Sequence, residues 1–294
     1  EKDEEEIDVI KDGMNLARVQ TYKNILANIP LGGGKIMVQA DQADLNDHEE
    51  LGFLSYAIDR VNFHTGPDMN YPLELTDAMN EYTLNITAGI NNNAVGSSGV
   101  TTSWGLTAAL KEAAKIWLNK DLSELSVGIM GLGEVGFSQA EFLLEFGSDI
   151  YISDINKDNV NKFINKYPNN SKIHVVEPDK ILYLDADVFC PSAIGGILTE
   201  DVINNLKYKM IFGSANNQLN AVDTEEEIRL ARLLKDRGIL YQDSWVHNIG
   251  GVLSGLESYL KGADGNKKEL YDRVAKICAD ITRRNLTEAI EKNI

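Results

Sequence analysis

The sequence has few cysteines, few basic residues and no long apolar run. Only two of its 294 residues are cysteines, Cys190 and Cys278, which gives neither a disulfide framework nor a metal-binding spacing and fits a reducing cytoplasm. The 28 lysines and arginines face 45 aspartates and glutamates, a formal net charge of −17. Nucleic-acid binding is therefore not expected, because phosphate contacts need concentrated positive charge. No apolar stretch reaches the roughly 18 residues of a membrane span.

What is present is the composition of an ordinary globular protein. The chain is 43% hydrophobic and 25% charged, and its length suggests about two domains. Its first six residues are mostly acidic and give neither a methionine start nor a signal peptide. Ile7, Ile10, Met14 and Ala17 then recur with helical spacing, so we expect an amphipathic helix there. A second amphipathic helix is expected over residues 51–61.

The stretch from Thr21 to Val38 carries two lysines, Lys23 and Lys35, the second directly after three glycines. The apolar run at 36–38 predicts a buried strand. Glycines lack Cβ and let backbone or ligand approach closely. A lysine in such a place can be desolvated, which lowers its pKa toward neutrality and suits it to proton transfer. The alternative is a glycine turn with a solvated lysine.

A glycine pattern typical of dinucleotide-binding domains lies between an apolar strand and a helix at residues 127–146. Gly131 would make the tight turn, Gly133 would let the backbone reach a pyrophosphate, and Gly136 would permit close helix–strand packing. The next strand ends in Asp154, whose carboxylate would accept hydrogen bonds from ribose hydroxyls and repel a 2′-phosphate. NAD is therefore favoured as the cofactor over NADP, although Lys157 lies nearby.

Strands and helices alternate after this pattern, which predicts an α/β fold with a doubly wound parallel sheet. We expect helices at 155–166, 199–206 and 253–293, and strands at 172–176, 187–190 and 210–213. Ligands bind such sheets at the carboxyl ends of the strands. Polar clusters follow two strand ends, at 190–193 and 213–218, and either could bind a ligand or cap the next helix. Cys190 is not expected to be a nucleophile, because no adjacent basic residue would stabilise its thiolate.

Tyr22-Lys23-Asn24 followed by Pro30-Leu31-Gly32-Gly33-Gly34-Lys35 resembles the active-site segment of the glutamate/leucine/phenylalanine/valine dehydrogenases, and the chain is most similar to leucine dehydrogenase-like members. That family deaminates L-amino acids to 2-oxo acids with a nicotinamide cofactor. The resemblance implies that Lys23 binds the substrate α-carboxylate and that Lys35 is the catalytic lysine. It also implies that Asp68 transfers protons during catalysis. From the sequence of the loop 64–72 alone, Asp68 would be interpreted as a turn residue.

The resemblance implies further contacts with cofactor and substrate. Thr102 would hydrogen-bond near the nicotinamide amide, although Thr101 or Thr102 could instead cap a helix. Asn248 would contact the nicotinamide or the substrate. His247 stands where the family usually has an aliphatic residue, and a lone histidine is more often a structural hydrogen-bonding residue. The substrate side chain would lie near Gly66, Val246 and Ile249. The remaining implied dinucleotide contacts are Gly131, Gly133, Glu134, Val135, Gly136, Asp154, Ile155, Ala193, Ala215 and Asn216.

The expected substrate is a branched-chain or aromatic L-amino acid. No lysine or arginine other than Lys23 and Lys35 stands near the motifs to receive a second carboxylate, and burying an unpaired charge costs several kcal/mol. Glycine at position 66 would also leave more room beside the loop than alanine. The loop sequence 67–70 is nevertheless closer to the glutamate-type members, which keeps a glutamate dehydrogenase as an alternative.

Three parts are expected: an N-terminal α/β substrate domain at 1–101, an NAD-binding Rossmann domain at 102–252, and helices at 253–294 that return to the first domain. Family members carry a further N-terminal stretch with strands, so the first domain is expected to be truncated. A catalytically impaired or non-catalytic dinucleotide-binding homologue is the alternative that follows. Otherwise we expect a cytoplasmic, homo-oligomeric, NAD-dependent amino acid dehydrogenase that needs no metal ion.

Overall fold

The computed structural model describes residues 5–38, 47–66, 68, 71, 73–87, 89 and 93–294. The chain divides into two compact units. The first unit comprises Glu1–Ser98 and Gly251–Asp272, and the second comprises Gly99–Gly250 and Arg273–Ile294. Each unit therefore contains two separate stretches of the chain. The three-part division at 1–101, 102–252 and 253–294 stays a prediction.

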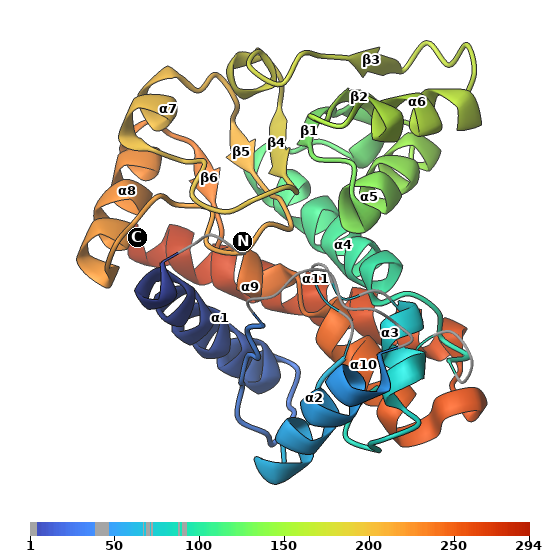
Figure 1. The fold of residues 1–294 in the computed structure, drawn as a ribbon. Helices are drawn as coiled ribbons and strands as arrows, with labels where there is room; N and C mark the ends of the chain where they lie inside the picture. The colour runs from blue at the N-terminus through green and yellow to red at the C-terminus, as the bar shows by residue number, and fades with distance from the viewer. Residues whose placement is uncertain are drawn as a thin grey trace. The chain divides into compact units, whose positions relative to one another are not determined.

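The second unit is built on a six-stranded parallel sheet (Figure 1). Its strands are β1 Ser126–Met130, β2 Asp149–Ser153, β3 Ile173–Val175, β4 Val188–Pro191, β5 Met210–Ile211 and β6 Leu240–Tyr241. They lie in the order β3-β2-β1-β4-β5-β6, with Val127 of β1 between Ile150 of β2 and Val188 of β4. The strand order reverses between β1 and β4, and doubly wound sheets bind ligands at the carboxyl ends of the two strands that flank this point. The predicted fold class is confirmed.

Helices join and cover these strands. They are α4 Ser98–Trp117, α5 Glu134–Glu145, α6 Lys157–Lys166, α7 Glu200–Asn205, α8 Thr224–Asp236, α9 Ser244–His247 and α11 Lys267–Lys292, with 3-10 helices at Leu122–Glu124 and Ile181–Tyr183. Helix α5 packs on β1 and β2, and α8 packs on α7 and β6. Three helices begin at a side chain that accepts a backbone N–H of the first turn: Asn156, Thr199 and Asp223.

Two packing contacts hold this unit together. One core combines Phe189 of β4, Ile211 of β5 and Leu230 of α8, all fully buried. The other is the crossing of α4 and α11, where a Cβ on Gly105 would lie 2.7 Å from Val274 Cγ1. The absence of a side chain at Gly105 therefore lets the two helices approach closely.

The first unit contains α1 Glu6–Leu26, α2 His48–Arg60, α3 Leu73–Met79 and most of α10 Gly250–Lys261, followed by a 3-10 helix at Gly262–Asp264 (Figure 1). Helices α2 and α3 bury a small apolar core that consists of Leu51, Ile58, Leu75, Met79 and Ile86. Both helices predicted near the start of the chain are present, but the apolar residues Ile7, Ile10 and Met14 of the first are 57, 48 and 69% exposed. The first of them continues to Leu26 and so carries Lys23.

The prediction of a buried strand at residues 36–38 is wrong. Ile36, Met37 and Val38 form no strand, and their side chains are 38, 40 and 57% exposed. An apolar run becomes a strand only where another strand pairs with its backbone, and no strand within the described ranges does so here. Lys35 is therefore held by a loop, and the contacts of that loop decide where it lies.

Some elements of the structure were not predicted from the sequence. The short strand β6 and the helices α3, α8 and α9 were not among the expected elements. Over the described residues, none of the helices is both long and apolar enough to cross a membrane.

Candidate active site

The last turns of α1 hold the glycine loop by its backbone. Thr21 Oγ1 accepts a hydrogen bond from Gly33 N at 3.0 Å. Asn24 Nδ2 donates to the carbonyl oxygens of Leu31 and Gly32, each at 3.1 Å. A Cβ on Gly33 would overlap the backbone of Thr21 and lie 2.6 Å from Ala17 O, so only glycine lets the loop lie this close to the helix. These contacts hold the loop that carries Lys35 against α1, the helix that carries Lys23.

Lys23 and Lys35 both lie where their charges are poorly solvated. Lys23 is 9% exposed, and burial lowers its pKa to about 7, with the charge of Lys35 adding to the effect. Burial also lowers the pKa of Lys35, while the carboxylate of Asp12 raises it. The Lys35 ammonium forms an ion pair with the Asp68 carboxylate, which is itself 55% exposed. The first unit thus contains a buried lysine, Lys23, whose pKa responds to the charge of Lys35, and Lys35 in turn forms an ion pair with Asp68.

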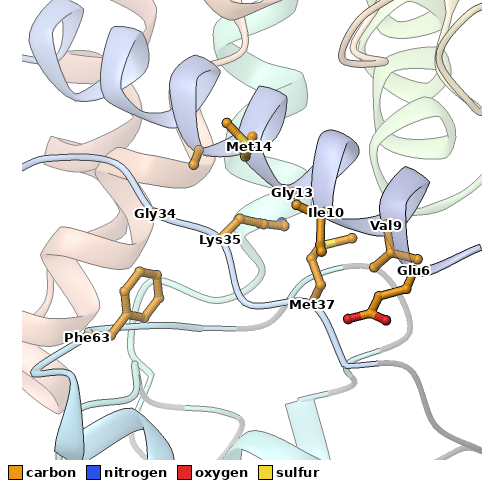
Figure 2. A pocket seen from close by; sticks show the side chains of 10 residues that line it. Glu6, Val9, Ile10, Gly13, Met14, Gly34, Lys35, Met37 and Phe63 are labelled. Carbon is orange, nitrogen blue, oxygen red and sulfur yellow. The ribbon is translucent and has the colours of Figure 1, made fainter.

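A groove of about 570 Å³ opens beside Lys35 (Figure 2). One wall is α1, and the other is the segment around Met37 together with Phe63. Figure 2 shows the side chain of Lys35 pointing toward Gly13 of α1. Most of the lining is apolar: Val9, Ile10, Met14, Ala17, Met37 and Phe63. An apolar group next to the lysine could occupy this groove.

Gly66 is fixed by a close contact with Thr87. A Cβ there would overlap Thr87 Oγ1 and lie 3.4 Å from Thr87 Cβ. The prediction that glycine at position 66 leaves extra room is therefore wrong, because the side chain of Thr87 fills that space. Beyond it, Asp68 pairs with Tyr71 as an isolated bridge. The glutamate-like character of the loop rests on Pro67, Met69 and Asn70, which lie outside the described residues.

In the second unit, the glycine pattern forms the turn between β1 and α5. Gly131 has a φ of +101°, a conformation that favours glycine, and a Cβ there would lie 2.8 Å from Ala193. A Cβ on Gly136 would overlap the Gly131 carbonyl oxygen, so α5 can begin close to the strand only with glycine. Gly133, in contrast, has nothing within 4 Å of its Cβ position and leaves α5 open at its N-terminus. Helix N-termini of this kind hold phosphate groups.

Asp154 joins the end of β2 to this turn. Its Oδ2 accepts a hydrogen bond from Leu132 N at 2.6 Å, and its Oδ1 accepts one from Asn156 N at 2.7 Å. The neighbouring side chain, Ile155, is 88% exposed although it is apolar. A carboxylate and an exposed apolar side chain at the end of the second strand match the needs of an adenosine, whose ribose offers hydroxyls and whose base offers an apolar face.

A third group of residues follows β5 and α9. Asn248 Nδ2 donates to Ser214 O at 3.0 Å and to Asn216 Oδ1 at 3.2 Å, while Ala215 N donates to Pro191 O at the end of β4. Ser214 O can only accept, so the orientation of the Asn248 amide follows from this bond. Its Oδ1 is buried, and no group in the described part of the chain donates to it. A buried acceptor of this kind fits a ligand that carries an N–H group.

Comparison with known proteins agrees with this geometry. Residues 3–78 match the model of the Glu/Leu/Phe/Val dehydrogenase dimerisation domain, and residues 151–294 match that of glutamate/leucine/phenylalanine/valine dehydrogenase. The chain is 32% identical to leucine dehydrogenase of Thermoactinomyces intermedius, covering 92% of this chain and 74% of that protein. It is also 32% identical to phenylalanine dehydrogenase of Caldalkalibacillus thermarum, covering 86% and 67%. The chain belongs to the glutamate/leucine/phenylalanine/valine dehydrogenase family.

A solved structure supports the same assignment. L-tryptophan dehydrogenase from Nostoc punctiforme superimposes with a TM-score of 0.75 at 27% identity, covering 99% of this chain and 80% of that one. As a member of the Glu/Leu/Phe/Val dehydrogenase family, the protein is an oxidoreductase that acts on the CH–NH2 group of amino acids. Its cofactor is that of the family, a nicotinamide dinucleotide. The open glycine turn fits such a group, as does Asn248 Oδ1, which receives no donor from the described residues.

The other implied dinucleotide contacts lie around the start of α4. A Cβ on Gly250 would lie 2.6 Å from Thr102 Cα, which brings Thr102 close to Asn248 in space. Helix α4 begins at Ser98, so neither Thr101 nor Thr102 is its N-cap. The side chain of Glu134 lies against Gly99 in the first turn of α4.

The same helix contacts the residue after Glu134. Val135 O accepts a hydrogen bond from Ser103 Oγ at 2.7 Å. The turn between β1 and α5 is thus held to α4 at two successive positions, Glu134 and Val135.

Val246 and Ile249 are 4% and 0% exposed. They are apolar walls within the second unit, and their contact with a substrate stays a prediction.

Sequence reasoning missed the residues that hold the loops. Thr21 and Asn24 flank Lys23, and their spacing on one helix was the available signal for a loop contact. Gln218 donates to Gly213 O and Ala215 O, each at 3.0 Å. His247 is fully buried and hydrogen-bonded to Gln242 and Gly213, in agreement with the structural role expected for it.

Neither cysteine is exposed, and Cys278 Sγ donates a hydrogen bond to His247 O at 3.5 Å. Both are free and buried, and burial raises the pKa of the Cys190 thiol, which keeps it protonated. No cluster of three histidine, cysteine, aspartate or glutamate side chains suited to a metal ion occurs among the residues that the structure describes.

Proposed function

We propose that the protein catalyses the reversible, NAD-dependent oxidative deamination of an apolar L-amino acid to the 2-oxo acid and ammonia. The observation that carries this proposal is the cluster of Lys23, Lys35 and Asp68 in the first unit. The similarity to leucine and phenylalanine dehydrogenases supports an apolar substrate.

Lys23 binds the substrate α-carboxylate. Lys23 is almost fully buried, so little water competes with a carboxylate for its hydrogen bonds. Hydrogen bonds between an ammonium group and a carboxylate are also strong. Its pKa of about 7 means that the arriving negative charge also draws a proton onto the lysine. Binding of the substrate and protonation of Lys23 are therefore coupled.

Lys35 and Asp68 move protons at the reacting carbon. The chemistry that NAD supplies when bound is the acceptance of a hydride from Cα, which leaves the substrate as an imine. Lys35 takes a proton from the water that attacks the imine carbon, and Asp68 passes a proton to the amine nitrogen as the C–N bond breaks. Asp68 obtains that proton from Lys35, so Lys35 is neutral again when ammonia leaves. Lys35 then takes the remaining hydroxyl proton, and the oxygen of the water stays as the 2-oxo group. Burial lowers the pKa of Lys35, which favours the neutral form that acts as the base.

The dinucleotide is held by the carboxyl edge of the sheet. Gly131, Gly133 and Gly136, with the neighbouring Glu134 and Val135, form the pyrophosphate turn. Asp154 accepts from the ribose hydroxyls, and its negative charge disfavours a 2′-phosphate, which favours NAD over NADP. Ile155 would pack on the adenine, and the residues that would contact the nicotinamide are Thr102, Ala193, Ala215, Asn216 and Asn248.

The substrate side chain is apolar. The groove beside Lys35 is lined mainly by apolar side chains, and Val246 and Ile249 are apolar and buried. A second substrate carboxylate would need a cation other than Lys23 and Lys35, because an unpaired buried charge is costly. Gly66 adjoins the proton-transferring loop and is the third residue proposed on the side-chain wall.

The assembly is a homo-oligomer in the cytoplasm. Residues 3–78 match a dimerisation domain, which supports contacts between copies of this chain. Both cysteines are free, which supports a reducing compartment.

A substrate panel tests the function. The protein is offered leucine, valine, phenylalanine, tryptophan and glutamate with NAD and, separately, with NADP, and reduction of the cofactor is followed at 340 nm, the NADH absorption. We expect the highest kcat/KM with an apolar amino acid and NAD. Glutamate as the best substrate would contradict the pocket argument. No reduction with any amino acid, combined with measurable NADH binding, would indicate the non-catalytic homologue instead.

A further inference from the structure

His247 is a buried histidine with both ring nitrogens engaged. It is the last residue of α9 and 0% exposed. Its Nε2 lies 3.1 Å from Gly213 O, and its Nδ1 lies 3.0 Å from Gln242 Nε2. A carbonyl oxygen can only accept, so Nε2 carries the proton and Nδ1 accepts from the glutamine amide. The ring is stacked on Phe212 with 4.1 Å between centroids.

The carbonyl that His247 contacts begins the loop after β5. Gly213 O accepts from His247 Nε2 and from Gln218 Nε2, Ala215 O accepts from Gln218 Nε2, and Ser214 O accepts from Asn248 Nδ2. Side chains from α9 and from Gln218 thus hold three successive carbonyls. Such a loop has few alternative positions while these bonds remain.

The same loop orients Asn248, the residue after His247. The Asn248 amide nitrogen donates to Ser214 O and Asn216 Oδ1. Asn248 is 6% exposed, and none of the described residues donates a hydrogen bond to its Oδ1. The direction of this acceptor depends on where Ser214 and Asn216 lie. Their position depends in turn on the bonds at Gly213 O.

We propose that His247 is a positioning residue of the dinucleotide site: by bridging Gln242 and Gly213 O, it fixes the loop Gly213–Asn216 and so aims Asn248 Oδ1 at the bound nicotinamide. This inference rests on the proposed dinucleotide function. His247 does not touch the cofactor, and its effect passes through Gly213 and Asn248. An aliphatic residue here would pack against Phe212 but would leave Gly213 O with one donor fewer.

The support behind His247 reaches α11. Gln242 Nε2 donates to His247 Nδ1 and also to Thr282 Oγ1 at 3.1 Å. Thr282 is 0% exposed. Helix α11, which carries none of the proposed cofactor contacts, therefore supports the glutamine that orients the imidazole.

Titration of NADH, followed by its fluorescence, tests the proposal with a readout other than turnover. We expect His247→Leu to weaken NADH binding about tenfold, the size of one lost buried hydrogen bond that supports a ligand contact. His247→Gln should restore most of the affinity, because a glutamine amide reaches as far as Nε2 and also donates to Gly213 O. Steady-state kinetics should show the loss chiefly in the KM for NAD.

A purely structural role predicts a different pattern. Ser148→Ala is the matched control, since Ser148 is fully buried and donates to Leu122 O at 2.6 Å, far from the carboxyl edge of the sheet. It should lower the unfolding temperature without changing the Kd for NADH. If His247→Leu lowers the unfolding temperature but leaves this Kd at the wild-type value, the positioning role is refuted.

A second variant decides the matter if His247→Leu does not fold. Gln242→Leu leaves His247 in place but removes the amide that orients its ring, so NADH binding should weaken about threefold, which is about 0.6 kcal/mol and half of a typical buried hydrogen bond. Unchanged binding in Gln242→Leu would overturn the proposal. Absence of NADH binding in the wild type would instead overturn the proposed function.

Discussion

Gly33 lies on the backbone of α1 so closely that a Cβ atom would be 2.6 Å from Ala17 O and would overlap Thr21 N. The neighbouring Gly32 has nothing within 4 Å of its Cβ position. Packing against α1 therefore requires glycine at position 33 but not at position 32. The contact of Gly33 with Ala17 and Thr21 fixes the position of the loop that carries Lys35 relative to the helix that carries Lys23.

Gly33→Ala should displace the loop and separate the two lysines. Because the backbone of α1 cannot move aside, we expect a loss of about 1–3 kcal/mol in the free energy of unfolding and a large drop in kcat/KM for the amino acid. Urea denaturation and steady-state kinetics measure the two effects. Gly32→Ala is the matched control and should change neither by much. Equal effects of the two substitutions would show that the contact with α1 does not position Lys35.

Lys35→Ala should abolish turnover while leaving dinucleotide binding intact. General base catalysis contributes about 100- to 10,000-fold, and we expect kcat to fall by that factor. NADH titration measures binding to the proposed dinucleotide site of the second unit, whereas Lys35 belongs to the first unit. Lys11→Ala is the control, because Lys11 is an exposed lysine of α1 paired with Asp8. Turnover by Lys35→Ala at the wild-type rate would end the proposed mechanism.

Lys23→Met should stabilise the protein at neutral and acidic pH although it removes substrate binding. The folded-state pKa of about 7 lies below the ordinary value of 10.5. Between these pH values the unfolded chain holds a proton that the folded chain lacks, so the stability of the wild type rises with pH across this window. The cost of burying the charge is therefore largest below pH 7, where methionine avoids it.

The measurement is urea denaturation of both proteins at pH 6, 8 and 10. We expect an advantage for Lys23→Met on the order of a few kcal/mol at pH 6, shrinking toward zero as the pH approaches 10.5. A variant that is less stable than the wild type at pH 6 would show that Lys23 is favourably paired in the folded state.

Asp154→Ala should weaken NAD and reduce discrimination against NADP. The carboxylate both holds Leu132 N in the glycine turn and carries the charge that a 2′-phosphate would meet. Asp154→Asn separates the two roles, because an asparagine oxygen can still accept from Leu132 N but has no charge. We expect both variants to lose about tenfold in the NAD/NADP preference, and only the alanine variant to lose additional NAD affinity. A wild type that prefers NADP would contradict the assignment of Asp154.

The sheet could be predicted from the sequence because its signals are local. Gly131, Gly133 and Gly136 stand in one turn, and Asp154 ends the strand that follows, so a short stretch of chain specifies the pattern. Strand β6 is only Leu240–Tyr241 and has too few residues for an alternation to appear. Residues 36–38 show the opposite error, since an apolar run was present but no neighbouring strand paired with it.

Lys23 and Lys35 could be predicted as site residues from the sequence, but the hydrogen bonds that position the loop of Lys35 could not. The spacing of Thr21 and Asn24 on one helix was a signal for a contact with a loop, but it did not indicate that Asn24 would bind the carbonyls of Leu31 and Gly32, because such bonds depend on where the loop lies. The same holds for His247, whose partners Gln242 and Gly213 come from different strand ends. Side-chain contacts between elements follow from the packed structure and not from periodicity.

The return of α11 to the second unit determines when this protein can finish folding. Gly105 of α4 is packed against α11, and Arg283 pairs with Glu112, a residue 171 positions earlier in the chain. Helix α4 and the six strands of the sheet are synthesised before residues 273–294. The surface of α4 at Gly105 that α11 covers is therefore uncovered until α11 is made, and apolar surface exposed for that time is a risk for aggregation.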